Sequence, residues 1–336
     1  MLLLILTLVF ANNFQPSQNQ GPPEPAELQE ASKLNEASVK QFNSGNYDEA
    51  LSLAKRALAI RGRLLPDADP RISSSVGNLA EIYTAKKDYK LAKEAWQRLL
   101  RIQESVFGPD DVNLAFTLDR LAILHYAARN SRETEETYKR ALALREKGLG
   151  PNDPQVGQSW FKLGEFYRFE QNLNASLDSY KRALRIFGKA NGVKSEEFLR
   201  AEEGITCLDY QYSRPDLHEE AEEIRKEFGT PEVVSPKNAD EPQIGGVLNG
   251  RALKLVQPEY PGAAAARRLS GQVVVKVRID EEGNVISAHD MCTGPPFLSE
   301  AAVSAALKSR FTPTLLSGQP VSITGIILYN FTRRFK

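Results

Sequence analysis

Two hydrophobic patterns divide this chain. From about Glu27 to residue 228, apolar side chains recur every three to four residues, which places them on one face of a helix. From Gly271 to His289 the spacing changes to two residues, as in a strand with one buried and one solvated face. The pattern therefore predicts a long helical region followed by a smaller domain that contains a sheet.

The helical region is internally repeated. Residues of the same type recur at a spacing of 42 positions, as in Leu79, Leu121 and Leu163. Further columns with this spacing are Tyr47 and Tyr89; Leu34, Val76, Leu118 and Trp160; Ala57, Leu99, Ala141 and Ala183; Ala54, Trp96, Tyr138 and Tyr180; Ser38, Ala80, Ala122 and Gly164; Ala50, Ala92, Thr134 and Ser176. We expect pairs of antiparallel helices, in which small residues allow close approach and each pair covers the apolar face of the next.

Turn signals recur with the repeat. The segments "LLPDADP", "FGPDDV" and "LGPNDP" end near Pro70, Val112 and Pro154. Gly108 and Gly150 are placed to adopt the left-handed conformation that often ends a helix, and the proline that follows each of them stops the helix from continuing.

These columns resemble the tetratricopeptide repeat, in the 42-residue form found in kinesin light chains. The resemblance covers about residues 32–198, four repeats, and residues 199–228 look like a degenerate helix pair that caps the array. One departure is His125, which stands where Tyr83 and Tyr167 stand in neighbouring repeats.

The resemblance implies a concave surface that binds a peptide or protein segment. First-helix residues line this surface in the family, and by position these are Asn35, Glu81, Asp119, Tyr126, Phe161, Arg168 and Phe169. The alternative interpretation is that several of these side chains are ordinary solvated surface.

The C-terminal region predicts a small α+β layer. One face of its first strand carries Val273, Val275, Val277 and Ile279, and Val274 is the one apolar exception on the other face. Gly283 suits a hairpin turn, and residues 285–291 return as the second strand. A short helix after Pro261, a helix across residues 295–311, a loop over "TPTLLSGQP" and a last strand over 321–331 complete the predicted order.

This region resembles the C-terminal domain of TonB. The matching segments are "PEYP", "GQVVVKVRIDEEGNV", "SRFTPTLLSGQPV" and "ILYNF", in that order. The predicted fold class is therefore multidomain: an all-α tetratricopeptide solenoid followed by a small α+β TonB C-terminal-type domain with a three-stranded antiparallel sheet.

The TonB resemblance implies a partner site on the last strand. In such domains this strand lies at the sheet edge and accepts a segment of an outer-membrane receptor by strand addition. Here the edge would be Val321, Ser322, Ile323, Thr324, Gly325, Ile326, Ile327, Leu328, Tyr329, Asn330 and Phe331. Alternatively, the tail from Arg333 to Lys336 or a second copy of the chain covers this edge.

The predicted domain organisation begins with an apolar segment. Residues 1–11 are too short to cross about 30 Å of hydrocarbon but have the length of a signal-peptide core, with Val9 and Ala11 small enough for a cleavage site. We expect export to the periplasm or cell envelope; the alternative is a short buried helix.

Four further segments follow the apolar start. They are a flexible polar spacer (12–26), the repeat array (27–228), a Pro/Gly-rich linker (229–246) and the TonB-like domain (247–336).

Composition and candidate chemistry point away from catalysis. Lys and Arg total 43, as do Asp and Glu, so the chain has no net charge and we expect no nucleic-acid partner. His125, His218 and His289 lack metal-ligand spacing, and no nucleophile or phosphate-loop motif occurs. Cys207 and Cys292 fall in different predicted domains, and we expect small buried hydrophobic residues rather than a bridge. No enzyme, cofactor or metal is predicted.

These features favour a non-catalytic adaptor of the cell envelope. The repeats would hold one protein partner, and the terminal strand edge would dock an outer-membrane receptor. Two alternatives remain open: a TonB-type energy transducer for transmembrane transport across the outer membrane, and a structural assembly protein that forms a homodimer through the C-terminal domain.

Overall fold

The computed structural model describes residues 24–212, 214, 216–228, 252–262, 264, 271–292, 296–316 and 318–331. The predicted signal segment (1–11), most of the polar spacer (12–26) and the predicted linker (229–246) lie outside these residues. By its internal contacts the chain divides into two compact units, residues 1–109 and 110–336.

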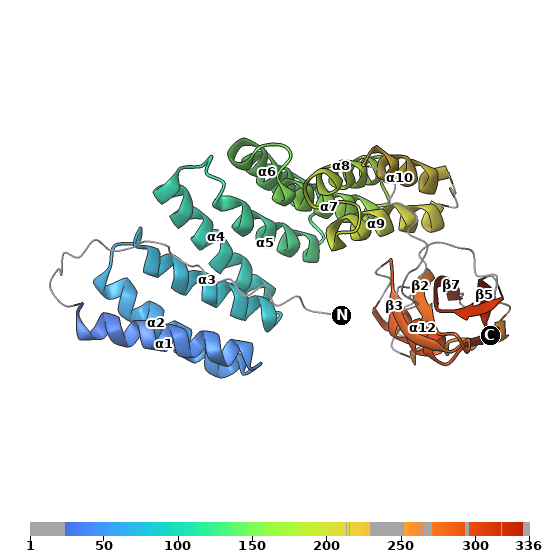
Figure 1. Cartoon of the computed structure of the whole chain (residues 1–336). Helices are drawn as coiled ribbons and strands as arrows, with labels where there is room; N and C mark the ends of the chain where they lie inside the picture. Colours follow the sequence, from blue (N-terminus) through green and yellow to red (C-terminus); the bar gives the residue numbers. More distant parts are fainter. Residues whose placement is uncertain are drawn as a thin grey trace. The chain divides into compact units, whose positions relative to one another are not determined.

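The first unit is a pair of helical hairpins. Its helices are α1 (Ala26–Asn43), α2 (Tyr47–Leu64), α3 (Pro70–Ala85) and α4 (Tyr89–Phe107) (Figure 1). Helix α1 packs on α2, α2 on α3, and α3 on α4. This sequential packing is the arrangement that the 42-residue columns predict.

The second unit continues the helical pairs and then changes fold class. Its helices are α5 (Leu114–Ala127), α6 (Ser131–Leu149), α7 (Pro154–Phe169), α8 (Leu173–Asn191), α9 (Glu196–Tyr212) and α10 (Asp216–Glu227) (Figure 1). Helices α5 and α6 form one hairpin and α7 and α8 the next, while α9 packs on α8 and α10 on both α8 and α9. The predicted capping pair is therefore α9 and α10.

Small residues at the predicted columns bring the paired helices together. Ser38, Ala80 and Ala122 are fully buried, and the hydroxyl of Ser38 donates to the carbonyl oxygen of Ala50 across the first hairpin at 2.8 Å. Gly164 occupies the same column, and a Cβ atom there would lie 2.8 Å from the ring of Tyr180. The columns of small residues are thus set by steric limits between helices.

The backbone turns repeat with the sequence. Within successive hairpins the residues with positive φ are Gly45, Lys87, Arg129 and Gln171, spaced by 42 positions. Gly108 and Gly150 also have positive φ, as expected, but their ψ values of 162° and 157° are extended rather than left-handed helical. This region of backbone conformation is open essentially to glycine alone.

The C-terminal domain is the predicted α+β layer. Strands β3 (Val285–Asp290), β2 (Gly271–Ile279) and β7 (Ile323–Phe331) form an antiparallel sheet in that order, and α12 (Pro296–Leu307) packs against it. Two short pairs accompany it: β1 (Ala252–Lys254) with β4 (Arg310–Phe311), and β5 (Thr314–Leu316) with β6 (Gln319–Val321). The predicted loop before the last strand was wrong, because β5 and β6 make it a hairpin.

The domain core joins the inward faces of the sheet to α12. The four predicted inward residues of β2 are buried against Leu298 and Ala302 of α12 and against Ile327 and Tyr329 of β7. Gly283 makes the predicted turn with φ of 85°, and a Cβ atom there would lie 2.0 Å from the carbonyl oxygen of Phe311. A hydrogen bond from the Phe311 amide to the Gly283 carbonyl fixes this contact at 2.8 Å.

The two cysteines form a disulfide, contrary to our expectation. Cys207 lies on α9 and Cys292 follows β3, and their Cα atoms are 5.3 Å apart, within the range that a bridge requires. The expectation was wrong because it treated the helical cap and the TonB-like domain as separate bodies. Strand β2 contacts α9 directly, so the two cysteines meet across that contact.

Adding a methyl group at Gly164 tests the helix-packing account. We expect Gly164→Ala to destabilise the fold by about 1–3 kcal/mol, because the new Cβ atom overlaps the buried ring of Tyr180. Gly62→Ala is the matched control: Gly62 is an exposed helical glycine with no atom near its Cβ position, so alanine should be neutral or stabilise by about 0.5–1 kcal/mol. Urea unfolding followed by circular dichroism measures the stability of both variants. If Gly164→Ala unfolds at the same urea concentration as Gly62→Ala, the proposed steric limit at Gly164 is wrong.

Candidate functional site

The predicted groove residues of the first unit lie on α1 and α3. Asn35 on α1 is half-buried and accepts a hydrogen bond from the side-chain amide of Asn78 at 2.9 Å. Glu81 on α3 is also half-buried. The pair of amides joins α1 to α3 and still presents polar atoms at a partly open surface.

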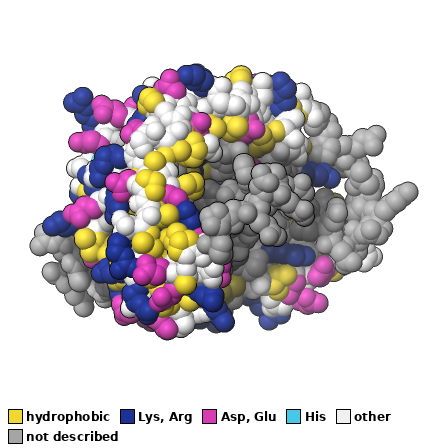
Figure 2. All heavy atoms as spheres, turned by 90° about the vertical axis from the view of Figure 1, so that its left-hand side faces the viewer, with side chains coloured by type: hydrophobic (Ala, Val, Ile, Leu, Met, Phe, Trp, Pro, Cys, Tyr) yellow, Lys and Arg dark blue, Asp and Glu magenta, His cyan; other side chains and the backbone are white. Residues whose placement is uncertain are grey.

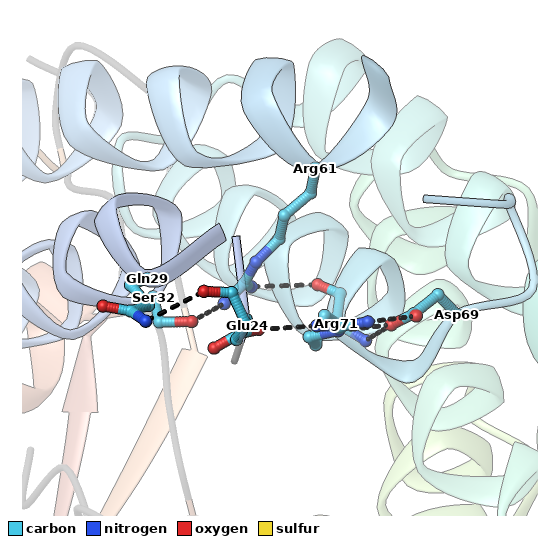
Figure 3. A network of polar contacts seen from close by, with 6 residues as sticks. All are labelled: Glu24, Gln29, Ser32, Arg61, Asp69 and Arg71. Atoms are coloured by element: carbon cyan, nitrogen blue, oxygen red, sulfur yellow. Dashed lines mark hydrogen bonds and ion pairs between the residues drawn. The ribbon is translucent and has the colours of Figure 1, made fainter. Parts of the chain in front are cut away.

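A buried arginine organises the polar contacts of this unit. Arg61 on α2 is 5% exposed and donates to the carbonyl oxygen of Arg71 and to the hydroxyl of Ser32 (Figure 3). It also donates to the hydroxyl of Ser75. Burial lowers the pKa of Arg61, and the nearby charge of Arg71 lowers it further. Arg71 is itself held by two carboxylates, those of Asp69 and Glu24.

The corresponding position in the second unit carries an ionic version of this arrangement. Arg145 on α6 donates to the hydroxyl of Ser159 at 2.7 Å and to Oδ2 of Asp119 at 2.6 Å. Lys162 donates to the same oxygen at 2.6 Å. Burial lowers the pKa of Lys162, while the adjacent charge of Asp119 acts in the opposite direction. Asp119 is therefore shared by two cations.

Equivalent positions in the two units thus differ in charge but not in placement. Asn35 and Asn78 of the first unit stand 84 positions before Asp119 and Lys162 of the second. Asp119 is 4% exposed, and its carboxylate contacts Arg145 and Lys162 inside the array. Lys162 retains a partly exposed side chain and is the member of this group that a partner can reach.

Two aromatic residues of the predicted groove are exposed and adjacent. Tyr126 at the end of α5 and Phe169 at the end of α7 are 39% and 40% exposed, and their ring centroids lie 6.2 Å apart. Phe166 packs edge-on to Tyr126. Arg168 is buried, paired with Glu165 at 3.0 Å, and its guanidinium carbon lies 4.4 Å from the Phe169 ring centroid. We call Tyr126, Phe166 and Phe169 the aromatic ridge.

Phe161 lies apart from the aromatic ridge. It is half-buried, its ring centroid is 5.8 Å from that of Tyr180, and Arg200 of α9 lies over it. Of the seven predicted groove residues, Asp119 and Arg168 are buried, Asn35, Glu81 and Phe161 are half-buried, and Tyr126 and Phe169 are exposed.

The predicted partner strand lies at the sheet edge. Strand β7 pairs with β2 over its whole length, from Ile323 opposite Ile279 to Phe331 opposite Gly271. Among the described residues no strand pairs with its other side. Val321 belongs to β6 and Ser322 links the two strands, so the strand itself is two residues shorter than predicted.

The direction of the backbone groups follows from the ladder. The Val274 carbonyl accepts from the Met291 amide on the β3 side, and the Ile279 carbonyl accepts from the Ser322 hydroxyl on the β7 side. Backbone groups of successive strand residues point to opposite sides. The residues of β7 opposite Val273, Val275 and Val277 therefore bond to β2, whereas the outward N–H and C=O groups belong to Thr324, Ile326, Leu328 and Asn330.

The side chains of these four residues share the face opposite the core. Leu328 is 39% exposed, Asn330 is exposed, and Thr324 and Ile326 are half-buried. The alternate residues Ile327, Tyr329 and Phe331 are buried in the domain core. A guest strand would thus meet backbone groups that no described strand pairs with, flanked by a mixed apolar and polar surface.

The contact between α9 and β2 was not predicted from the sequence. Lys276 on the outer face of β2 forms an ion pair with Glu203 of α9, one helical turn from Cys207. Val274 lies on the same outer face and is 3% exposed. It was the one exception to the alternation, and an apolar residue on the solvated face was the available signal that something covers this part of the strand.

Comparison with known families agrees with the two folds. Tetratricopeptide repeat families match residues 42–71, 71–147 and 157–189, and the Gram-negative bacterial TonB protein C-terminal family matches residues 256–332. The chain is a tetratricopeptide repeat array joined to a TonB C-terminal domain. The array is a protein-interaction scaffold, and the second domain is of the kind found in the cell envelope.

Solved structures share the fold of the array. A kinesin light chain from Podosopora anserina with nearly identical TPR-like repeats aligns with a TM-score of 0.52 and 17% identity, over 61% of this chain and 97% of that one. BtubC from P. vanneervenii aligns with a TM-score of 0.50 and 15% identity, over 66% and 96%. At these identities the likeness concerns the fold alone.

A sequence relative matches only the TonB domain. Protein TonB of Vibrio cholerae is 34% identical over 68 residues, which is 20% of this chain and 28% of that protein. The chain thus spans 28% of the relative's length.

Charged and metal-ligating side chains of the described residues are the other features that can mark a site. In the part of the array that Figure 2 shows, basic and acidic side chains are interspersed without a patch of one sign. Within the described ranges, no group of three or more His, Cys, Asp or Glu residues is arranged to hold a metal ion. Of the helices described, none is both long enough and apolar enough to cross a membrane.

Neutralising Asp119 tests the buried ionic group. We expect Asp119→Asn to cost about 3–5 kcal/mol of stability, because it leaves Arg145 buried without its counter-charge. Asp110→Asn removes a solvent-exposed pair with Lys147 and should leave stability unchanged. Urea unfolding at neutral pH compares the free energies of unfolding of the two variants. Equal values would show that the charge of Asp119 does not stabilise the fold.

Proposed function

We propose that this chain is a non-catalytic adaptor of the cell envelope. Its repeat array holds a protein segment, and β7 of its TonB domain docks a segment of an outer-membrane receptor by strand addition. The observation that supports the proposal is the side of β7 with which no strand of the described residues pairs, where four backbone positions from Thr324 to Asn330 point outward.

The edge has the properties that strand addition requires. Main-chain hydrogen bonds of a guest would supply affinity, and alternate side chains would supply selectivity. The outward backbone groups alternate with residues locked into the β2 ladder, so a guest can bind without disturbing the sheet. Leu328 and Ile326 offer apolar contact, while Thr324 and Asn330 favour a polar residue at each end of the guest.

The aromatic ridge is the contact that we propose for the array. Tyr126 and Phe169 expose large rings whose centroids lie 6.2 Å apart, and aromatic rings contribute much of the binding energy of protein interfaces. The conformation of Arg168 and Asp119 is fixed by internal pairs, so these residues support the surface rather than contact the partner.

The disulfide supports an oxidising location. Bridges of this kind persist in the periplasm and are rare in the cytoplasm, where thiols are kept reduced. Together with the TonB domain, the Cys207–Cys292 bridge favours the periplasmic side of the envelope, reached through the signal-like residues 1–11.

A second candidate function is energy transduction across the outer membrane. The identity with Vibrio cholerae TonB favours it. It predicts association with inner-membrane motor proteins and loss of active uptake when the gene is deleted. Uptake that is unchanged in the deletion strain would exclude it and leave the adaptor.

Proline substitution on the outward positions tests the docking edge. Ile326→Pro and Leu328→Pro each remove an amide that points away from β2, so the sheet should remain intact. We expect the affinity for the guest peptide to fall by about tenfold or more. Each proline removes one main-chain hydrogen bond to the guest and shifts the adjacent ones, which together cost about 1.4 kcal/mol of binding free energy. The probe is a set of synthetic peptides that tile the periplasm-facing segments of the same organism's outer-membrane receptors.

Ala288→Pro is the matched control. Ala288 pairs with Val277 across the β2–β3 ladder and its amide points to the opposite edge of the sheet, so binding should be unchanged. Circular dichroism must first show that all three variants fold. If the β7 variants keep full affinity, or if Ala288→Pro alone loses it, docking on β7 is refuted. Dimers of the free chain that Ile326→Pro dissociates would instead identify a second copy as the guest.

A further inference from the structure

The contact between α9 and the TonB domain is built from side chains that face each other. On α9, Glu203 and Cys207 are one turn apart and so share a face. On the TonB domain, Lys276 and Cys292 meet them, through an ion pair and a disulfide. We call these four residues the α9 dock.

The TonB side of the dock is rigid. The Met291 amide donates to the Val274 carbonyl at 2.9 Å and extends the β2–β3 ladder beyond β3. The Cys292 amide donates to Asp290 at 3.1 Å, and Ser299 of α12 donates to the same carboxylate. Cys292 is therefore held at a fixed place on the sheet rather than on a free loop.

A cavity and one ion pair accompany the bridge. A cavity of about 210 Å³ lies beside the bridge, lined by Phe161, Glu165, Arg200, Glu203, Asp290 and Met291 among others. The polar side-chain contact that accompanies the bridge is the Lys276–Glu203 ion pair, whose two side chains are both partly exposed. A partly exposed ion pair contributes little to stability on its own. The bridge is what makes this contact persistent.

We propose that the Cys207–Cys292 disulfide is a redox-operated latch that fixes the TonB domain to the capping helix of the repeat array. With the bridge closed, helices α5–α10 and the TonB domain move as one body. When it is reduced, the dock opens and the domain is held only by the chain that follows α10. The inference rests on the dock itself and does not depend on which partners the array or β7 bind.

Opening and closing follow thiol–disulfide exchange. A dithiol reductant attacks as a thiolate at Cys292, the partly exposed member, and Cys207 leaves as a thiolate that takes up a proton. The second thiol of the reductant resolves the mixed disulfide. In total two electrons and two protons pass to the cysteine pair, and the reductant becomes a disulfide; closure by an oxidised dithiol protein is the reverse.

Cutting the chain between the two domains tests the latch in the full-length protein. A site-specific protease sequence is inserted after Lys237, and the folded chain is cleaved. We expect the pieces to stay linked in denaturant without reductant. We also expect native gel filtration at micromolar concentration to separate them once dithiothreitol is added. Pieces that part without reductant would show that no bridge forms, and pieces that stay together after reduction would show a permanent interface; either result overturns the latch.

The equilibrium of the bridge with glutathione tests the dock. Lys276→Glu places two carboxylates in contact and should lower the equilibrium constant for bridge formation by about tenfold. The exchanged pair, Lys276→Glu with Glu203→Lys, should restore it to within about threefold. Arg278→Glu is the matched control, because Arg278 lies on the same face of β2, is exposed and contacts Ser322 instead. If Lys276→Glu and Arg278→Glu give the same equilibrium constant for bridge formation, the Lys276–Glu203 ion pair does not hold the two domains together.

Discussion

The C-terminal domain is organised around strand β2, which lies between β3 and β7 in the sheet, with α12 on one face and α9 on the other. The odd-numbered residues of β2 from Val273 to Ile279 bury their side chains in the core beneath α12, and those as far as Val277 bond their backbone to β7. Its even-numbered residues from Val274 to Arg278 bond on the β3 side. A strand in the middle of a sheet has no unpaired backbone to offer, so the free groups fall on its neighbours. Its outer face is also in use, since Lys276 meets α9. Two features thus follow from the position of β2: the side of β7 that no described strand covers, and the contact with the repeat array.

The repeat array follows a comparable steric rule. Small residues at fixed positions bring two helices together, and large residues such as Trp96 and Tyr180 fill the remaining space. Polar groups then fill the same place in each unit with different chemistry: two amides in the first, and Asp119 with two cations in the second. The disulfide adds a covalent constraint between this array and the sheet. In the chain-entropy account, closing a loop of 85 residues restricts the unfolded chain by about 4–5 kcal/mol.

Most of the fold could be predicted because its determinants are local and periodic. The 42-residue columns gave the helical hairpins and their buried positions, and the two-residue alternation gave β2 and its core face. Short pairs such as β5 with β6 carry too few residues to show alternation, and so they were missed. The α9 dock was missed for a different reason: Cys207 and Lys276 are far apart in sequence, and pairing across domains leaves no period. Only Val274, apolar on a polar face, pointed to it. The solvent exposure of groove residues such as Asp119 depends on neighbouring helices, so it could not be predicted from position alone.

The most direct test of the account is amide hydrogen exchange along β7, measured by NMR with and without a bound receptor peptide. In the free chain, the amides of Ile327 and Tyr329 should exchange slowly and those of Ile326 and Leu328 quickly. Peptide binding should slow the second pair and leave the first unchanged. Slow exchange at Ile326 and Leu328 in the free chain, or no change on binding, would contradict a free docking edge.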